Sequence, residues 1–462
     1  MPQFEWVPAC LAVVALWALV SGIDDLFLQL ALAWRYASGR QEFEWPSAGE
    51  LRRAPRPRMA VFIPLWQEHR VIERMLRHNL KVTRAARCDF FVGVYPNDPG
   101  TRAAVDRMAR RHSRVRAAMN PQPGPTSKAD CLNAIYECML AEEQRSGSRY
   151  DVVVIHDAED LIDPEAPRLT GWFCARYGMV QVPVLPLPTP AREWTHGLYC
   201  DEFAEYQIKD IPVRQMLGGF IASNGVGTGF AREVLDQLAA ASGGRIFEPA
   251  SLAEDYQVGL RIHQLGWPQV FLNLRPGPLG PVATREYFPR GFGAAVRQRT
   301  RWVMGITLQS WQRFGWRVAP RQLYWLWRDR KGLAGNLLTP VVNLAFLYGA
   351  AVWIHTGRLP RAPEPGLEWV YGATVAISLL QMAVRGACSA HLYGWRFALG
   401  VPVRAVWGNG LNCAATVLAL WRFFSARLQG QPLSWAKTEH VYPSEAALAP
   451  YTPAAAEEFR SR

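Results

Sequence analysis

The sequence predicts an α/β domain carried between membrane-spanning helices at its two ends. Three hydrophobic, strand-like runs alternate with amphipathic helical patterns between residues 58 and 315. Uncharged apolar stretches of the length that crosses a bilayer lie before and after that region. Polar and acidic residues follow the strand-like runs, where an open α/β sheet binds its ligands.

Composition supports a membrane protein over a nucleic-acid binder. The chain has 462 residues, 51 Lys+Arg against 39 Asp+Glu, a net charge of +12, 19% charged residues and 12% aromatic residues. The basic residues are scattered rather than clustered on one face, so we expect no nucleic-acid partner. The eight cysteines form no CxxC pair, which favours buried reduced thiols over disulfides or a zinc cluster.

The N-terminal apolar stretch predicts an uncleaved anchor. Trp6 to Ile23 is uncharged, and no basic residue precedes it as in a signal peptide. Asp24 and Asp25 interrupt the pattern before a further apolar run from Leu26 to Trp34. These two acids lie either at the membrane boundary, as an interfacial kink, or inside a helix bundle packed by protein.

Two C-terminal stretches, Leu333–Ile354 and Leu367–Val384, are predicted spans. A fourth, Ala405–Phe424, contains two Gly and two Asn and is weaker, so we favour three spans over four. Arginine-rich segments flank the central region, so we expect a multi-pass protein whose central region faces the cytoplasm.

The segment Trp316–Trp327 mixes Trp, Tyr and Leu with Arg, a pattern typical of a helix at the level of the lipid headgroups or of a soluble surface helix. The expected domains are an anchor and basic linker (1–57), an α/β domain (58–315), an interfacial amphipathic helix (316–332), a membrane region of two or three spans (333–443) and a disordered tail (444–462).

Within the central domain, β-branched and aromatic residues predict strands at Met59–Trp66, Asp89–Tyr95 and Asp151–His156. Helical patterns cover 68–87, 101–111 and 127–144, so we expect a parallel sheet. No GxGxxG follows the first strand and no GxxxxGK[ST] occurs, which argues against a dinucleotide-binding fold and a P-loop.

Three carboxylates, Asp157, Glu159 and Asp160, come directly after the third strand. Such a group suits Mg²⁺ or Mn²⁺ bridging a diphosphate, although a solvated turn with helix-capping acids has the same pattern. Further on, Ser251 and Glu254 match a capping box that opens a helix. Asp255 is the sharper candidate for a general base, against the alternative of a first-turn acid that favours the helix dipole.

The segment Gln298-Arg299-Thr300-Arg301-Trp302 places three side chains on one face if it is helical. Arg301 can hold a phosphate with two hydrogen bonds, and Trp302 offers a flat ring for a sugar. The plain alternative is a basic amphipathic helix resting on the membrane.

Together these motifs resemble the inverting family-2 glycosyltransferases with a GT-A (nucleotide-diphospho-sugar transferase) fold, whose processive membrane members include cellulose synthases. More narrowly, the chain resembles the phage-adsorption protein B-like glycosyltransferases. The segments that carry this resemblance are YPNDPGT (95–101), GPTSKADCLN (124–133), HDAEDLIDPE (156–165), YCDEFAEYQIKD (199–210), LAEDYQVGLRI (252–262) and WAKTEHVYP (435–443).

The resemblance implies roles for individual residues. It places Pro64, Glu68, Asp98 (on uracil) and Lys128 at the nucleotide of a UDP-sugar, and Asp157-x-Glu159 at a divalent metal with Asp160 as a further ligand. It makes Asp255, in the pair with Glu254, the general base, and it gives the diphosphate and the acceptor to Gln298, Arg301 and Trp302. Glu159 departs from the usual aspartate but keeps the oxygen donors.

The implied activity is hexosyl or N-acetylhexosaminyl transfer from a UDP-sugar to a growing glycan, in exopolysaccharide or surface-glycan synthesis. Alternatives are a single transfer to a lipid carrier, which the low number of spans favours, and a non-catalytic scaffold or export subunit. The implied partners are membrane lipid, a glycan or lipid acceptor and an outer-membrane export partner. Longer relatives carry a domain that binds cyclic di-GMP, so such control would reach this chain through another protein.

Overall fold

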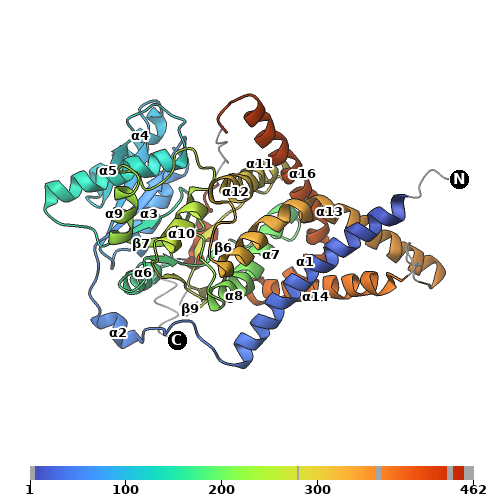
Figure 1. Cartoon of the computed structure of the whole chain (residues 1–462). Helices are drawn as coiled ribbons and strands as arrows, with labels where there is room; N and C mark the ends of the chain where they lie inside the picture. The colour runs from blue at the N-terminus through green and yellow to red at the C-terminus, as the bar shows by residue number, and fades with distance from the viewer. Residues whose placement is uncertain (1–5, 278–279, 359–365, 434–440, 452–462) are drawn as a thin grey trace.

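The computed structural model describes residues 6–277, 280–358, 366–433 and 441–451. It has two parts, an α/β domain and a set of long helices that project from one side of it (Figure 1). The sheet of the α/β domain has seven strands in the order β3-β2-β1-β4-β7-β5-β8. Their bounds are β1 Met59–Pro64, β2 Cys88–Val94, β3 Val115–Met119, β4 Val152–Ile155, β5 Met179–Gln181, β7 Thr228–Ala231 and β8 Gln269–Phe271.

We expected a parallel sheet, but the sheet is mixed. Strands β3, β2, β1 and β4 are parallel, but β7 runs antiparallel to both β4 and β5. The chain enters β7 through Gly225 and Gly227, whose φ angles of +77° and +60° permit the turn that reverses it. The three predicted strands correspond to β1, β2 and β4, whereas β3 and the strands after β4 were not predicted.

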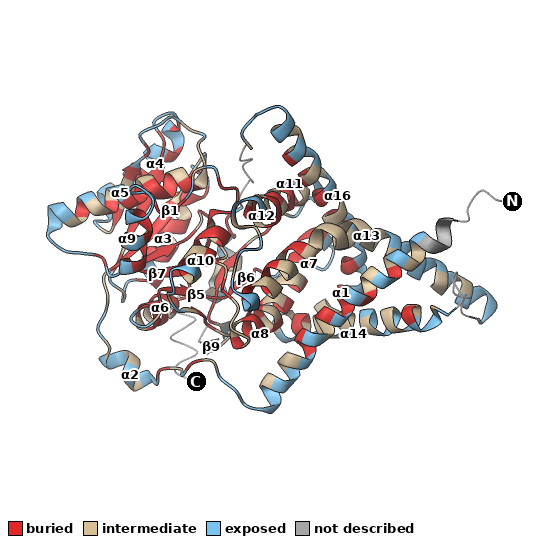
Figure 2. Ribbon diagram, in the orientation of Figure 1, coloured by how far each residue is buried: buried red, intermediate tan, exposed pale blue. Residues whose placement is uncertain are grey.

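Helices cover both faces of the sheet, as the alternation of buried side chains in β1 requires. Met59, Val61 and Ile63 pack against α3, α4 and α6, while Ala60 and Phe62 pack against α5, α9 and α10. Buried residues accordingly fill the sheet and the inner helix faces (Figure 2). The covering helices are α3 Ile72–Val82, α4 Pro99–Arg111, α5 Lys128–Ser146, α6 Ala166–Cys174, α9 Arg232–Ala240 and α10 Glu254–Gln264.

Further short elements connect this domain to the long helices. Two helical runs each contain a π-helical segment, which adds one residue to a turn. Their bounds are α7 Trp194–Glu205, η1 Tyr206–Asp210 and α8 Ile211–Met216, then α11 Phe292–Trp302, η2 Val303–Gln309 and α12 Ser310–Phe314. The remaining elements are α2 Ala48–Arg53, β6 Val184–Pro186, β9 Pro276–Gly277, β10 Gly280–Pro281 and β11 Thr284–Glu286, of which β11 pairs in parallel with β6.

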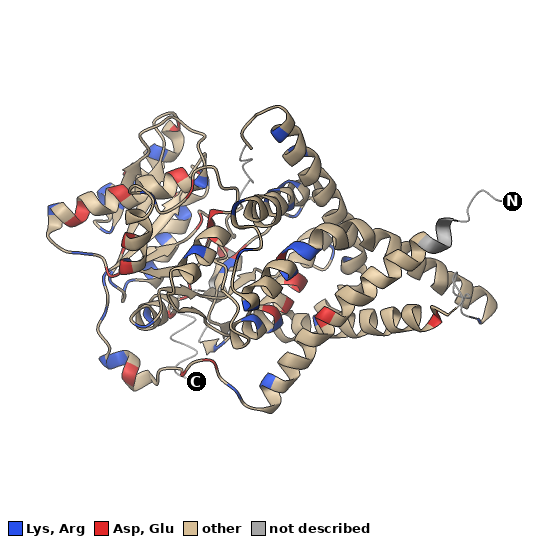
Figure 3. Ribbon diagram, viewed as in Figure 1, with Lys and Arg blue, Asp and Glu red and all other residues tan. Residues whose placement is uncertain are grey.

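Three helices in the described part of the chain are long and apolar enough to cross a membrane: α1 Trp6–Ala37, α13 Pro320–Thr356 and α14 Glu368–Tyr393. Helix α1 packs along α14 and α13. Their outer parts expose large apolar side chains, including Leu344, Tyr348 and Ile354 at 67%, 67% and 75%. Figure 3 shows that charged residues are sparse there, as expected of helices apolar enough to cross a membrane.

The predicted interfacial helix does not exist as a separate element. Residues 320–332 form the first turns of α13, which continues without a break into the second predicted span, and Trp316 precedes that helix. Trp325 and Leu326 are 2% and 0% exposed because they pack against the α/β domain. Trp325 therefore packs against protein, and this part of the Trp and Arg pattern marks a junction between the two parts.

The fourth apolar stretch lies in α16 Val401–Leu428, which follows the short helix α15 Trp395–Ala398. Helix α16 packs along α11, α13 and α7 and is not among the three long apolar helices. Its buried Arg404 pairs with Asp201 of α7, with Nε 2.6 Å from Oδ2. The contacts with α7 and α11 explain why this stretch combines apolar residues with Gly and Asn.

Asp24 and Asp25 lie within the unbroken helix α1, at the junction with the α/β domain. Asp24 is 7% exposed and accepts hydrogen bonds from Tyr324 Oη at 2.6 Å and Lys331 Nζ at 2.6 Å. Arg328 pairs with both acids and with Asp210 of η1. Of the two readings of these acids, the structure supports the protein-packed one over the interfacial kink.

The end of the described chain is folded, in contrast to the disorder predicted for 444–462. Residues 445–451 form α17 Glu445–Leu448 and the 3₁₀ turn η3 Ala449–Tyr451. Tyr442 is 6% exposed in the core of the domain, and Arg74 donates to the carbonyl of Pro443 at 2.6 Å. Most of the WAKTEHVYP segment, 435–440, and residues 452–462 lie outside the described residues.

Candidate active site

The site lies at the carboxyl ends of β1, β2 and β4. Because these strands are parallel, the segments that follow them meet at one edge of the sheet. A pocket at this edge contains side chains from all three segments and from two helices. Its described lining residues are Pro64, Leu65, Trp66, Glu68, Tyr95, Thr126, Ser127, Lys128, Cys131, Asp157, Ala158 and Arg301.

Lys128 is the central cation of the pocket. It is the first residue of α5, whose start is fixed by a capping box between Ser127 and Asp130. Its Nζ lies 2.7 Å from Asp157 Oδ1 and donates to the carbonyl of Gly225 at 3.3 Å. Burial opposes its charge, but the neighbouring carboxylates, led by Asp157, hold the pKa of Lys128 above its usual value.

The turn after β4 separates its three acids by role. Asp160 is fully buried, and its Oδ2 accepts from the backbone N of Asp157 at 3.1 Å and lies 2.7 Å from Nδ1 of His156. Burial lowers the pKa of His156 to about 3, so this ring is neutral. Asp160 therefore holds the shape of the turn through its hydrogen bonds. The side chain of Glu159 is buried, with 3% of its surface exposed. Of the three acids, Asp157 is the one that lines the pocket.

Glu254 and Asp255 begin α10 beside the same pocket. The predicted capping box is absent: the cap residue is Ala253, which has no side-chain oxygen, and Ser251 accepts only from the backbone of Ala253 at 3.3 Å. Burial and then the charge of Asp255 raise the pKa of Glu254 to about 7, and burial also raises the pKa of Asp255. Glu254 therefore does not take part in a capping box, and its carboxyl group is available for the chemistry of the site.

Close packing fixes Asp255 against the loop that holds Lys128. A Cβ added to Gly225 would lie 2.6 Å from Asp255 Oδ2, so only glycine fits at that position. Gly225 also has a φ of +77°. One glycine thus contacts Lys128 through its carbonyl and Asp255 through its α-carbon.

The Gln298–Trp302 segment is helical and forms the end of α11, and its three candidate residues contact different neighbours. Arg301 lines the pocket, and its charge acts on both Glu254 and Asp255. Gln298 Oε1 accepts from Tyr199 Oη at 2.8 Å, and the ring of Trp302 packs edge-on against Tyr199 at 6.1 Å between centroids.

The remaining predicted residues hold the loops around the pocket. Pro64 ends β1, and Glu68 is buried with its backbone N donating to Thr101 Oγ1 at 2.9 Å. Asp98 caps α4: Oδ1 accepts from Thr101 N at 3.2 Å and Oδ2 from Gln67 N at 2.6 Å. Asp98 therefore ties the segments after β1 and β2 together, and it is not itself a lining residue.

Four contributors were not predicted. Glu286 of β11 is buried, and burial followed by the charges of Asp160 and Asp157 raises its pKa well above the usual range. Trp66 and Tyr95 form an aromatic wall with ring centroids 5.2 Å apart, and Tyr199 positions the Gln298 segment. Tyr95 and Tyr199 stood inside the quoted motifs, but no sequence pattern marks Glu286, which β11 brings to the site.

The carboxylates at the strand ends include the residue types that hold divalent metals. Among the described residues, no three His, Cys, Asp or Glu side chains stand arranged to hold an ion, and Asp157, Glu159 and Asp160 do not converge. The residues still suit Mg²⁺ or Mn²⁺, because these ions prefer hard carboxylate oxygens as ligands. In the structure, Lys128 occupies the position of a cation beside Asp157. Burial, followed by the charges of neighbouring carboxylates, raises the pKa values of Glu286 and Glu254.

Several known proteins resemble this chain in sequence or in fold. Residues 55–305 match the family described as "Glycosyltransferase like family 2". The chain is 32% identical over 460 residues to Bacteriophage adsorption protein B of Escherichia coli K12 and to Bacteriophage N4 adsorption protein B of E. coli O157:H7. These alignments cover 92% of this chain and 61% of each relative, so the chain spans about three fifths of their length.

A solved structure shows the same fold. It is the mannosyltransferase PcManGT from Pyrobaculum calidifontis in complex with GDP-Man and Mn²⁺, with a TM-score of 0.52 at 17% identity. The match covers 89% of this chain and 99% of that one. The GT-A fold expected from the sequence is thereby confirmed, together with helices at both ends that are apolar enough to span a membrane.

Proposed function

Because the chain belongs to the family-2 glycosyltransferases, we propose that it transfers a sugar from a UDP-sugar to a growing glycan with inversion of configuration. One observation carries the proposal. Lys128, Asp157, Asp255 and Arg301 come from separate elements far apart in the sequence and meet around a single pocket at the strand ends. This convergence lies at the carboxyl ends of parallel strands, where an open α/β sheet binds its ligands.

The donor nucleotide is proposed to bind along the pocket wall. Trp66 and Tyr95 offer aromatic surface for the base, and Asp98, with lone pairs left on both oxygens, lies beside the same loop to face uracil. Lys128 and Arg301 supply charge for the diphosphate. A divalent ion held by Asp157 and Glu159 would neutralise charge on the departing diphosphate.

Asp255 is the proposed general base. A base must accept a proton from the acceptor hydroxyl, and burial raises the pKa of Asp255, which strengthens it as a base. Glu254, beside it, retains its proton up to about pH 7 and so leaves Asp255 as the ionised member of the pair. Gln298 and Trp302, braced by Tyr199, would orient the acceptor sugar next to them.

We propose that the protein works at the bacterial inner membrane, with α1, α13 and α14 as spans and the α/β domain in the cytoplasm. Support comes from the three apolar helices and from the arginine-rich segments beside them. The product would be an exopolysaccharide or surface glycan passed to an outer-membrane export partner.

The test is nucleotide release by the purified protein in lipid nanodiscs with a panel of UDP-sugars and GDP-mannose, each with Mg²⁺ or Mn²⁺. We expect one UDP-sugar to give turnover that Asp255→Asn lowers by about two to four orders of magnitude. Product length on a gel separates polymer from single transfer to a lipid carrier. Normal surface glycan in cells that carry folded Asp157→Ala or Asp255→Asn protein would instead establish a scaffold.

A further inference from the structure

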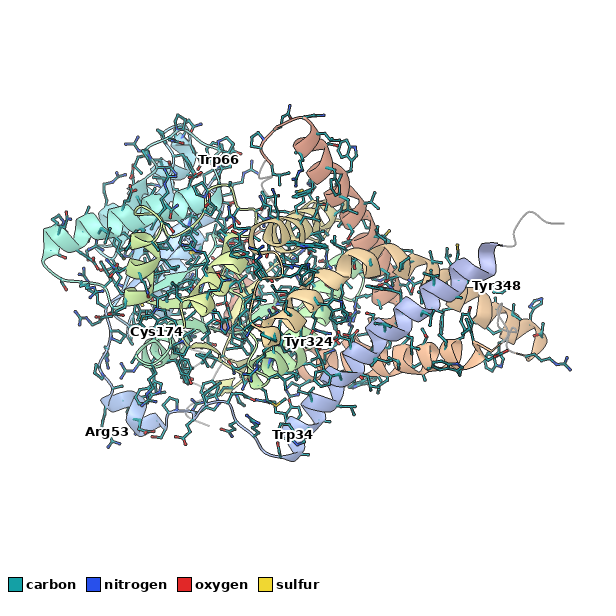
Figure 4. All side chains as sticks on the ribbon, viewed as in Figure 1. Trp34, Arg53, Trp66, Cys174, Tyr324 and Tyr348 are labelled. Atoms are coloured by element: carbon teal, nitrogen blue, oxygen red, sulfur yellow. The ribbon has the colours of Figure 1, made fainter. Side chains whose placement is uncertain are left out.

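A second cavity, of about 650 Å³, lies where the long helices meet the α/β domain. It is enclosed by the last turns of α1, the segment 39–45, the π-helical segment η1 and the last turns of α14. It shares no described lining residue with the catalytic pocket. Figure 4 shows the separation: Trp34, at the end of α1, and Trp66, in the catalytic pocket, lie at opposite edges of the molecule.

Two buried amides line this cavity with nothing to bind. Gln29 of α1 is 8% exposed and Gln207 of η1 is 0% exposed, and neither side chain has a hydrogen-bond partner among the described residues. A buried polar group left unpaired costs about 1–3 kcal/mol. Gln322, buried elsewhere, is fully paired through Phe220 N at 3.0 Å and Gly218 O at 2.9 Å. The two amides therefore point to a missing ligand.

The backbone presents Gln207 in an unusual way. The run from α7 through η1 to α8 is one helix whose middle turn is π-helical, and Gln207 is the second residue of that turn. Such insertions are frequently found at functional sites. In this chain the π-helical turn places Gln207 in the lining of the cavity.

The rest of the lining selects an anionic amphiphile. Arg40 stands at the mouth with Trp34 beneath its guanidinium, Arg35 is held by Glu42 at 2.8 Å, and no described lining residue is acidic. Apolar side chains of α1 and α14, such as Leu32 and Val384, continue from the cavity towards the apolar parts of those helices. A basic pocket between membrane helices on the cytoplasmic side suits a lipid headgroup.

We propose that this cavity binds the headgroup of an anionic phospholipid that carries hydroxyl groups, of the phosphatidylglycerol type. Its phosphate contacts Arg40, and its glycerol hydroxyls pair with Gln29 and Gln207, since hydroxyls and amides both donate and accept. Its acyl chains lie along α1 and α14. The proposal rests on those two helices crossing a membrane and is independent of the donor or acceptor used at the catalytic site.

Lipid retention tests the proposal directly. The full chain, purified from nanodiscs of equal phosphatidylglycerol and phosphatidylcholine, is examined by native mass spectrometry for bound lipid. We expect at least fivefold enrichment of phosphatidylglycerol in the wild type. We expect the Gln29→Leu/Gln207→Leu double variant and Arg40→Gln each to bring it within twofold of parity. Arg53→Gln, which removes an exposed arginine of α2 away from the cavity, should leave it unchanged.

Equal retention of the two lipids by the wild type would overturn the proposal, whether or not the variants fold. Enrichment that survives both cavity variants would also overturn it. So would displacement of the lipid by equimolar soluble glycerophosphoglycerol, which would assign the cavity to a free phosphodiester. A higher melting temperature of the double leucine variant without any wild-type lipid preference would identify water as the only occupant. None of these experiments measures nucleotide release, so the proposal about catalysis is tested separately.

Discussion

Two clusters of buried acids in this protein are built from the same residue types and differ in how completely they are paired. We call the first the junction cluster: Asp24, Asp25 and Asp210 with Arg328 and Lys331. The second is the strand-end cluster: Asp157, Glu254, Asp255 and Glu286 with Lys128 and Arg301.

In the junction cluster every acid is in contact with a cation. Arg328 reaches all three acids, Lys331 reaches Asp24 and Asp25, and Gln381 donates to Asp25 Oδ2 at 3.0 Å. These bonds join α1, α13, α14 and η1. Paired charges of this kind fix the relative positions of helices, so the cluster is structural.

In the strand-end cluster four acids share two cations. Burial raises the pKa values of Glu254, Asp255 and Glu286, and the charges of neighbouring acids raise those of Glu254 and Glu286 further. Unbalanced buried charge is unfavourable, and proteins retain it where a ligand or a reaction uses it. The comparison shows that intramembrane or buried acids are not functional by type alone. We propose that the strand-end cluster, whose charge is less completely compensated, is the one that serves the reaction.

The largest expected effect is loss of turnover in Asp255→Asn. Removal of the proposed base should lower kcat by about two to four orders of magnitude. Stability should hold or rise, since the charge beside Glu254 disappears. Nucleotide release and thermal unfolding of one preparation measure both. Wild-type turnover in the variant would remove Asp255 from the chemistry.

Asp24→Asn should lower stability and leave turnover unchanged, the reverse of Asp255→Asn. The change weakens the hydrogen bonds that Asp24 accepts from Tyr324, Arg328 and Lys331 and should lower the free energy of unfolding by about 2 kcal/mol. Turnover per folded molecule should stay near the wild-type value. Asp25→Asn is the matched control, with a smaller loss because its side chain is 24% exposed against 5% for Asp24. Equal stability of Asp24→Asn and wild type would contradict the structural role.

Glu254→Gln should make stability less dependent on pH. The folded pKa of about 7 lies above the usual 4.5, so the folded state binds more protons than the unfolded state between those values. Stability of the wild type therefore falls as pH rises from 4.5 to 7, by up to about 1.4 kcal/mol per unit of pKa difference. Melting temperatures at pH 5 and pH 8 should converge in the variant. If the difference between the melting temperatures at pH 5 and pH 8 is the same in the variant as in the wild type, Glu254 is not the group responsible for the pH dependence.

The smallest expected effect belongs to Tyr199→Phe. It removes the hydrogen bond to Gln298 Oε1, worth about 1 kcal/mol, and should lower kcat/KM for the acceptor about fivefold. Tyr150→Phe is the control, since Tyr150 is buried and donates to Asp89 Oδ2 at 2.6 Å. An equal loss in both variants would reflect general destabilisation.

The sequence predicted those parts of the site that follow directly from a strand or a helix face. Asp157 was located by the end of β4, and Arg301 and Trp302 by helical spacing. Glu286 was missed because β11 reaches the site only through its pairing with β6 and its bridge to Leu161, contacts that no local pattern encodes.

The sequence likewise predicted only part of the fold. Hydrophobic periodicity located β1, β2, β4 and their helices, but the antiparallel β7 is four residues long and depends on a glycine turn. The ends of α13 were misjudged because Trp and Arg at a lipid surface and Trp and Arg against a protein domain have the same pattern. Only tertiary packing distinguishes the two.

The most direct test of the strand-end cluster is calorimetric binding of UDP with and without Mn²⁺ to the wild type and to Asp157→Asn. The account predicts that Mn²⁺ tightens UDP binding at least tenfold in the wild type, about 1.4 kcal/mol, and that this gain disappears in the variant. Asp89→Asn, on β2 away from the pocket, should keep it. UDP affinity that is independent of Mn²⁺ and unchanged in Asp157→Asn would contradict the central claim.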